Sequence, residues 1–209
     1  MDGDCIQEIN SRLGRPTVSL AHYIRCSISE PLELFHTSGS CILTEMYSHT
    51  DILNVLKDWN GPQCSTLHIK RSSFSEEIIE ALAGPLPDGS WICPNLTKLI
   101  LSGYCEGMSN ERSAQGALVN MIQARDALNN NTGLLPHGHP GHVISSLTRL
   151  TVDTNGRFRC YVEADYLEWL NTNLDSVRWG GWSGGNGEHC ESESSTEERD
   201  SETNDSCEE

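Results

Sequence analysis

Four short segments of the chain share one spacing of apolar residues: a first position, a second three residues later, and a third two residues after that. These segments span residues 64–69, 96–101, 147–152 and 174–179, and a looser example lies at 32–34. Because side chains alternate along a strand, the last two apolar residues of each segment lie on one face. The pattern predicts strands near residues 32–35, 66–70, 97–102, 148–153 and 175–179.

Between these strands the apolar residues recur at helical spacing, which predicts helices over residues 51–59, 75–84, 116–128 and 162–171. Thr50 or Asp51 is expected to cap the first helix, and Ser75 the second, which stops at Gly84. Matched strand positions are 32, 51 and 27 residues apart, and two turn-rich insertions, 84–91 and 129–142, account for the longer intervals as surface loops. Strands and helices therefore alternate as degenerate repeats.

The most complete repeat is CPNLTKLILSGYC, residues 93–105. It resembles the cysteine-containing leucine-rich repeat of F-box/leucine-rich-repeat proteins. The surrounding sequence is similar in character to the F-box/leucine-rich-repeat-like proteins of mushroom-forming fungi. That unit runs C-x-x-L-x-x-L-x-L-x-x-C before a helix, and the second cysteine here falls one place later. The resemblance covers about residues 60–180. It implies an α/β, leucine-rich-repeat-like solenoid over residues 31–182, after a poorly defined segment 1–30.

In that family the repeats hold a substrate, while an N-terminal F-box binds the adaptor of a cullin-RING ubiquitin ligase. An F-box should open with a Leu-Pro pair and continue as helices, and residues 1–50 contain no such pair. The resemblance therefore implies a non-enzymatic protein-recognition module without a cofactor. A role as the substrate-binding part of a ubiquitin-ligase receptor, with the adaptor as a partner, follows if an F-box lies upstream.

Charge is distributed unevenly along the chain. The 209 residues carry a net charge of −16, and residues 183–209 hold ten acidic residues, one arginine and no Leu, Ile, Val, Met or aromatic residue. Such a segment cannot offset its ordering entropy by apolar burial, so we expect a disordered acidic tail. The acidic balance disfavours nucleic acid and membrane surfaces as partners. Nine cysteines without a C-x-x-C pair, and no apolar leader, favour the cytoplasm or nucleus.

Residues between the apolar strand positions should face away from the core, and several of them are basic. This predicted strip contains few acids, Asp153 and Asp175, and the cationic or imidazole side chains His68, Lys70, Lys98, Arg149 and Arg178. Our hypothesis is that this strip binds an acidic segment, either of a protein partner or of the chain's own tail as an internal competitor. The alternative is that these are ordinary solvated strand residues.

Three other groups suggest chemistry. Gly103-Tyr-Cys105-Glu-Gly107 resembles the turn that exposes a hydrolase nucleophile, with Asp126 and His137 following in chain order, so a small cysteine hydrolase using Cys105 is the alternative function. The same cysteine also fits the buried turn of the repeat. His137, His139 and His142 form a His-rich loop without a fourth ligand, and the acids at 76, 77 and 80 fit a solvated helix face. We predict no catalytic residue and no metal site.

Overall fold

The computed structural model describes residues 19–28, 38–103, 112–130, 144–153, 163–180 and 182–186. These residues form a seven-stranded sheet in which the strands follow one another in chain order. The strands are β1 (Leu20–Ile24), β2 (Ser40–Thr44), β3 (Thr66–Lys70), β4 (Lys98–Ser102), β5 (Arg149–Asp153), β6 (Ser176–Trp179) and β7 (Trp182–Gly184). The first six are parallel, and β7 pairs with β6 in the antiparallel sense. The α/β class with a mostly parallel sheet is therefore confirmed.

The four strands predicted from 66 to 179 are present within one residue of the expected bounds. Three strands, β1, β2 and β7, were not predicted, and β1 lies inside the segment 1–30 that the sequence left without elements. The strand expected at 32–35 lies outside the described residues. Strand β7 crosses residue 183, where the sequence analysis placed the start of the tail.

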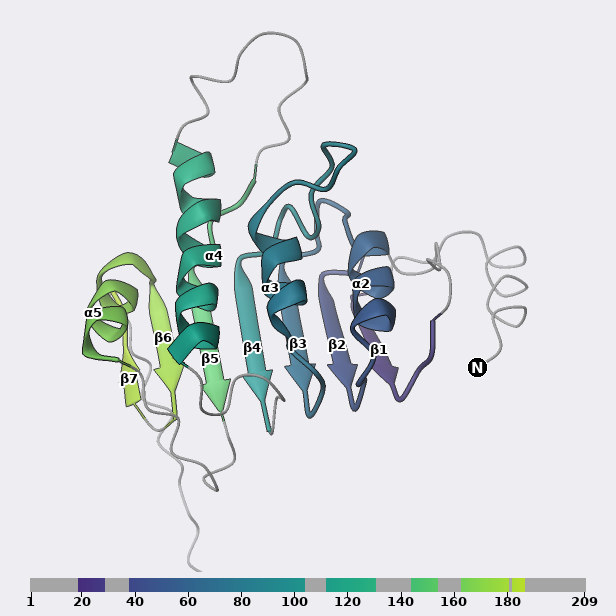
Figure 1. Ribbon diagram of the computed structural model, residues 1–209, viewed down its shortest axis with the longest axis horizontal. Helices are drawn as coiled ribbons and strands as arrows, with labels where there is room; N and C mark the ends of the chain where they lie inside the picture. Colours follow the sequence, from purple (N-terminus) through teal and green to yellow (C-terminus); the bar gives the residue numbers. More distant parts are fainter. Residues whose placement is uncertain are drawn as a thin grey trace, which may run out of the picture.

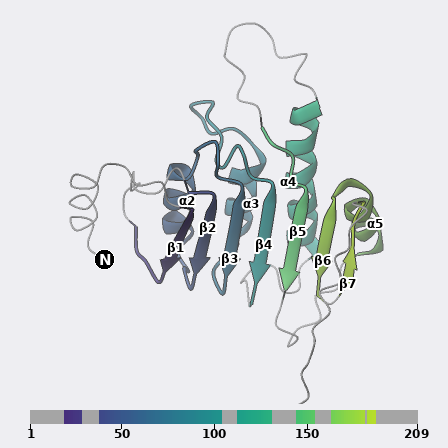
Figure 2. The same ribbon diagram turned by 180° about the vertical axis from the view of Figure 1, so that it is seen from behind.

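All four described helices lie on one side of the sheet (Figures 1 and 2). They are α2 (His49–Asp58), α3 (Glu76–Ala83), α4 (Arg112–Asn130) and α5 (Ala164–Asn173), which confirms the four predicted helices. The predicted cap of the first helix was wrong, because Ser48 accepts the bond from the Asp51 backbone N–H at 3.3 Å. The Asp51 carboxylate instead accepts from the Ile28 backbone N–H at 3.1 Å, which ties α2 to the segment after β1.

The core lies between the helices and one face of the sheet. Two rows of inward strand residues run across it: Ala21, Cys41, Leu67, Leu99, Leu150 and Val177, and then Leu43, Ile69, Leu101, Val152 and Trp179, all of which are buried. The helices add their apolar stripes, such as Ile52 and Leu56 from α2 and Ile78 and Leu82 from α3. Each helix and strand thus buries its apolar side mainly against its neighbours in the chain.

The same backbone turn follows four of the strands. The residue after each strand has a positive φ, at Arg25 (51°), Glu45 (56°), Arg71 (50°) and Gly103 (74°). Its N–H donates to the carbonyl of the last residue of the next strand, over 2.8–3.0 Å. Non-glycine residues rarely adopt this conformation. Three such residues at equivalent positions make this turn a repeated feature of successive units.

Candidate functional site

The face of the sheet opposite the helices is the open face, and Figure 2 views it directly. The strand register arranges its side chains in three rows. From β1 towards β6, the amino row is Leu20, Ser40, Thr66, Lys98, Arg149 and Ser176. The middle row is His22, Ile42, His68, Ile100, Thr151 and Arg178, and the carboxyl row is Ile24, Thr44, Lys70, Ser102 and Asp153. All five residues of the predicted strip therefore lie on one face.

Three of these five residues gather on β4–β6. Lys98 and Arg149 are direct register partners on neighbouring parallel strands, so their Cα atoms are about 5 Å apart. Arg178 lies on the next strand, two residues beyond Ser176, the register partner of Arg149. Among the described residues no carboxylate forms an ion pair with any of the three. We call Lys98, Arg149 and Arg178 the cationic cluster.

Within the cationic cluster, the Lys98–Arg149 pair opposes the stability of the sheet. Like charges directly opposite one another on neighbouring strands repel, and no described acid offsets this pair. Arg149 and Arg178 are exposed and Lys98 is half-buried, so all three ends are reachable from the open face. A local arrangement that costs stability without compensation is typical of functional surfaces.

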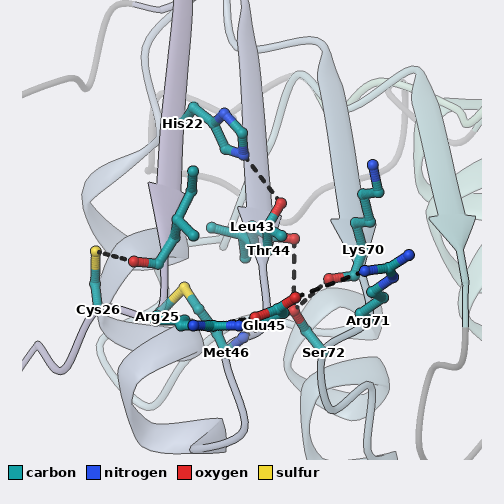
Figure 3. A network of polar contacts seen from close by, with 11 residues as sticks. His22, Arg25, Cys26, Leu43, Thr44, Glu45, Met46, Lys70, Arg71 and Ser72 are labelled. Atoms are coloured by element: carbon teal, nitrogen blue, oxygen red, sulfur yellow. Dashed lines mark hydrogen bonds and ion pairs between the residues drawn. The ribbon is translucent and has the colours of Figure 1, made fainter.

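The cations at the carboxyl end of β1–β3 have a different environment, shown in Figure 3. Glu45 lies between Arg25 and Arg71; it forms an ion pair with the Arg25 side chain, and its Oε1 lies 3.7 Å from Arg71 Nη1. The pKa of Arg25 is raised, chiefly by its hydrogen bond to Glu45. Lys70 lies beside this group and is exposed. The protein's own carboxylate thus already occupies part of this second cationic region.

The two histidines of the middle row act as hydrogen-bonding groups. His68 is half-buried and its Nε2 lies 2.6 Å from Ser102 Oγ. Burial, followed by the positive charge of Lys70, lowers the pKa of His68, so its imidazole is neutral at pH 7. His22 makes a similar contact, 2.9 Å from Thr44 Oγ1 (Figure 3). His68 therefore lies on the predicted strip but does not contribute a charge to it.

Among the described residues, acids are concentrated on the helix side of the sheet. Of the 13 Asp and Glu residues in the described ranges, eight lie in the helices and only Asp153 lies on the open face. Asp175 precedes β6 at the amino edge. The acids of α3 at 76, 77 and 80 are exposed, as expected for a solvated helix face. The described part of the open face is therefore cationic, on a chain whose net charge is −16.

The other groups suggested by the sequence remain separate from this face. Cys105 and the histidines at 137, 139 and 142 lie outside the described residues. Asp126 accepts a hydrogen bond from Ser146 Oγ at 2.9 Å. Within the described ranges no three His, Cys, Asp or Glu side chains come close enough together to hold a metal ion. In the same ranges, no helix combines the length and the apolar character that crossing a bilayer requires.

One buried cation was missed by the sequence analysis. Arg125 in α4 is fully buried, and its guanidinium donates to the carbonyls of Leu82 (3.0 Å), Cys93 (2.7 Å) and Pro94 (3.2 Å). It joins the end of α3 to the loop before β4. The signal was present, because Arg125 lies four residues after Met121 and therefore on the apolar stripe of its helix. This is a structural group, remote from the open face.

Comparison with known proteins gives no further constraint: no protein-family model, no curated protein and no solved structure matches the chain.

Proposed function

We propose that this chain is a leucine-rich-repeat-type solenoid whose open face recognises an acidic segment of a protein partner. The repeated post-strand turn, the sequential strand order and the helices on one side support the repeat architecture. The observation that carries the function is the cationic cluster, in which Lys98 and Arg149 are neighbours without a described carboxylate partner.

Charge complementarity defines the class of partner. Carboxylates can approach Lys98 and Arg149 from the open side, where the described sheet carries only Asp153 as an acid. The half-buried Ile100 lies two residues beyond Lys98 on the same strand and offers apolar contact next to the charges. A segment in which acidic and apolar side chains alternate fits this surface.

The test uses a short labelled peptide of alternating Glu and Ser, with its Gln counterpart as the reference ligand. Fluorescence anisotropy at low ionic strength should show binding of the Glu peptide alone. Lys98→Ser combined with Arg149→Ser should weaken binding about tenfold, as expected for the loss of two exposed ion pairs. Added salt should weaken binding of the peptide to the unmodified chain.

A matched control removes the same number of positive charges elsewhere. Arg25→Ser combined with Arg71→Ser takes away two cations that Glu45 already pairs, so peptide binding should change little. Equal weakening by both double variants would show that net charge alone governs binding. That result would refute recognition by the cationic cluster.

The role in a ubiquitin ligase rests on the family resemblance. Affinity capture of the chain from cytosol, followed by mass spectrometry, tests it directly. Recovery of a ligase adaptor and a cullin subunit would support a receptor role. Recovery of other proteins alone would leave a recognition module without ubiquitin transfer.

A further inference from the structure

The last described residues of the chain, which follow β7, lie next to the amino row of the open face. Strand β7 runs antiparallel to β6, so it returns the chain from Trp179 towards the start of β6, where Gly184 lies opposite Val177. The Asn186 backbone N–H then donates to the carbonyl of Leu174 at 2.8 Å. Asn186, the last described residue, therefore lies beside the amino end of β6.

This end of the described chain is fixed by close backbone packing. Gly185 has a φ of 136°, and a Cβ at this position would lie 2.4 Å from the Asp175 carbonyl oxygen. Its N–H also donates to Asn171 Oδ1 at 2.7 Å. Only glycine fits at this contact. The position of the last described residues is thus set by the fold.

The segment that follows can reach the cationic cluster. Strand β7 lies one strand outside β6, so Arg149 on β5 and Lys98 on β4 lie about 10 and 15 Å from β7 across the sheet. An extended residue spans about 3.3 Å, so Glu188 and Glu191 can extend about 7 and 17 Å beyond Asn186. Residues 187–209 carry ten acids and one arginine.

We propose that residues 187–209 dock on the open face, with their first carboxylates on Lys98 and Arg149, and compete there with a partner's acidic segment. The docking is inferred from the position of the last described residues and from the charge of residues 187–209. The competition rests on the proposed function. A short tether holds the acids at an effective concentration of the order of millimolar. Docking that fills the site nine-tenths of the time weakens a partner's apparent affinity about tenfold.

Zero-length carbodiimide cross-linking of the full chain tests the docking. The sequence has three lysines, Lys57, Lys70 and Lys98. At low ionic strength, peptide mapping should find amide links from Lys98 to tail carboxylates, and these should disappear at high salt. Lys57 lies in α2 on the helix side and is the internal control. Tail links to Lys57 as frequent as those to Lys98, or no links to Lys98, would overturn the proposal.

The competition is tested with the Glu/Ser peptide. Neutralising the first tail acids should tighten peptide binding about tenfold, whereas neutralising three acids of α3, on the other side of the sheet, should not. The two matched variants are Glu188→Gln/Glu191→Gln/Glu193→Gln and Glu76→Gln/Glu77→Gln/Glu80→Gln. Equal tightening by both would overturn the competition.

The two proposals fail in different ways. Peptide binding that depends on Lys98 and Arg149, without cross-links from the tail to Lys98, would reject the internal competitor and leave the proposed function standing. Cross-links to Lys98 in a chain that binds no acidic peptide, even with its tail neutralised, would reject the proposed function and retain the docking.

Discussion

Arg125 offers the sharpest test of how the helical layer is held to the sheet. Its guanidinium is buried, and two of the carbonyls that it bonds, those of Leu82 and Cys93, are also buried. The Leu82 carbonyl belongs to the last turn of α3, where Gly84 is extended. Arg125 thus takes the place of a C-terminal cap for that helix.

The cost of Arg125→Ala follows from these contacts. A buried carbonyl without a partner costs about 1–3 kcal/mol, and two are left unpaired. Loss of the aliphatic stem adds a cavity, while release of a desolvated charge offsets part of the total. We expect a net loss of about 3 kcal/mol in the free energy of unfolding. With a urea m-value of about 2 kcal/mol/M, the midpoint should fall by about 1.5 M.

Urea denaturation of a graded series separates the contributions. Arg125→Met keeps much of the stem but no donor, and Arg125→Lys keeps the charge but cannot bond carbonyls on both sides. The midpoint should therefore fall least for Lys, more for Met and most for Ala. Arg178→Ala, which truncates an exposed arginine, should leave the midpoint unchanged. If the midpoint of Arg125→Met matched that of the wild-type chain, the carbonyl contacts would contribute nothing to stability, which would refute the role assigned to Arg125.

Three further predictions concern single side chains. Arg71 has a φ of 50°, so Arg71→Val should cost about 1–2 kcal/mol, whereas Lys70→Val in the adjacent strand position should not; equal urea midpoints would contradict this. Because burial lowers the pKa of His68, the folded state binds its proton less readily than the unfolded state. The free energy of unfolding should therefore carry no penalty from His68 at pH values above the unfolded pKa of about 6.5, and it should decrease as the pH falls below that value. His68→Gln should reduce this decrease in a pH series of thermal melts. Burial raises the pKa of the Cys93 thiol, so native Cys93 should resist iodoacetamide while half-exposed Cys26 reacts. Peptide mapping measures both, and equal labelling rates would refute the assignment.

Sequence patterns identified the strands whose inward residues are strongly apolar. In β3–β6 both inward positions are large and apolar, as with Leu99 and Leu101. In β1 the inward residues are Ala21 and Tyr23, while the more apolar Leu20 and Ile24 point outward and are about half exposed. The usual alternation is therefore reversed there, and the strand could not be found from hydrophobicity alone.

The candidate site was predictable in composition but not in arrangement. Alternation along each strand is enough to place Lys98 and Arg149 on the same face. Only the register shows that two residues separated by a 51-residue interval are direct neighbours, and that Lys70 lies apart from them at the other end of its strand. Likewise, the pairing of Arg25 and Arg71 with Glu45 depends on two strands that the sequence did not reveal.

The chain-ordered sheet has a consequence for biosynthesis. Each strand from β2 to β7 pairs with the strand made just before it, so no ladder has to wait for a distant part of the chain. On the ribosome, each new unit can add to a surface that has already formed, and the nascent protein can grow by accretion. Strand β7 is made last of these strands and runs in the opposite direction, so it covers the growing edge only when the parallel strands are in place.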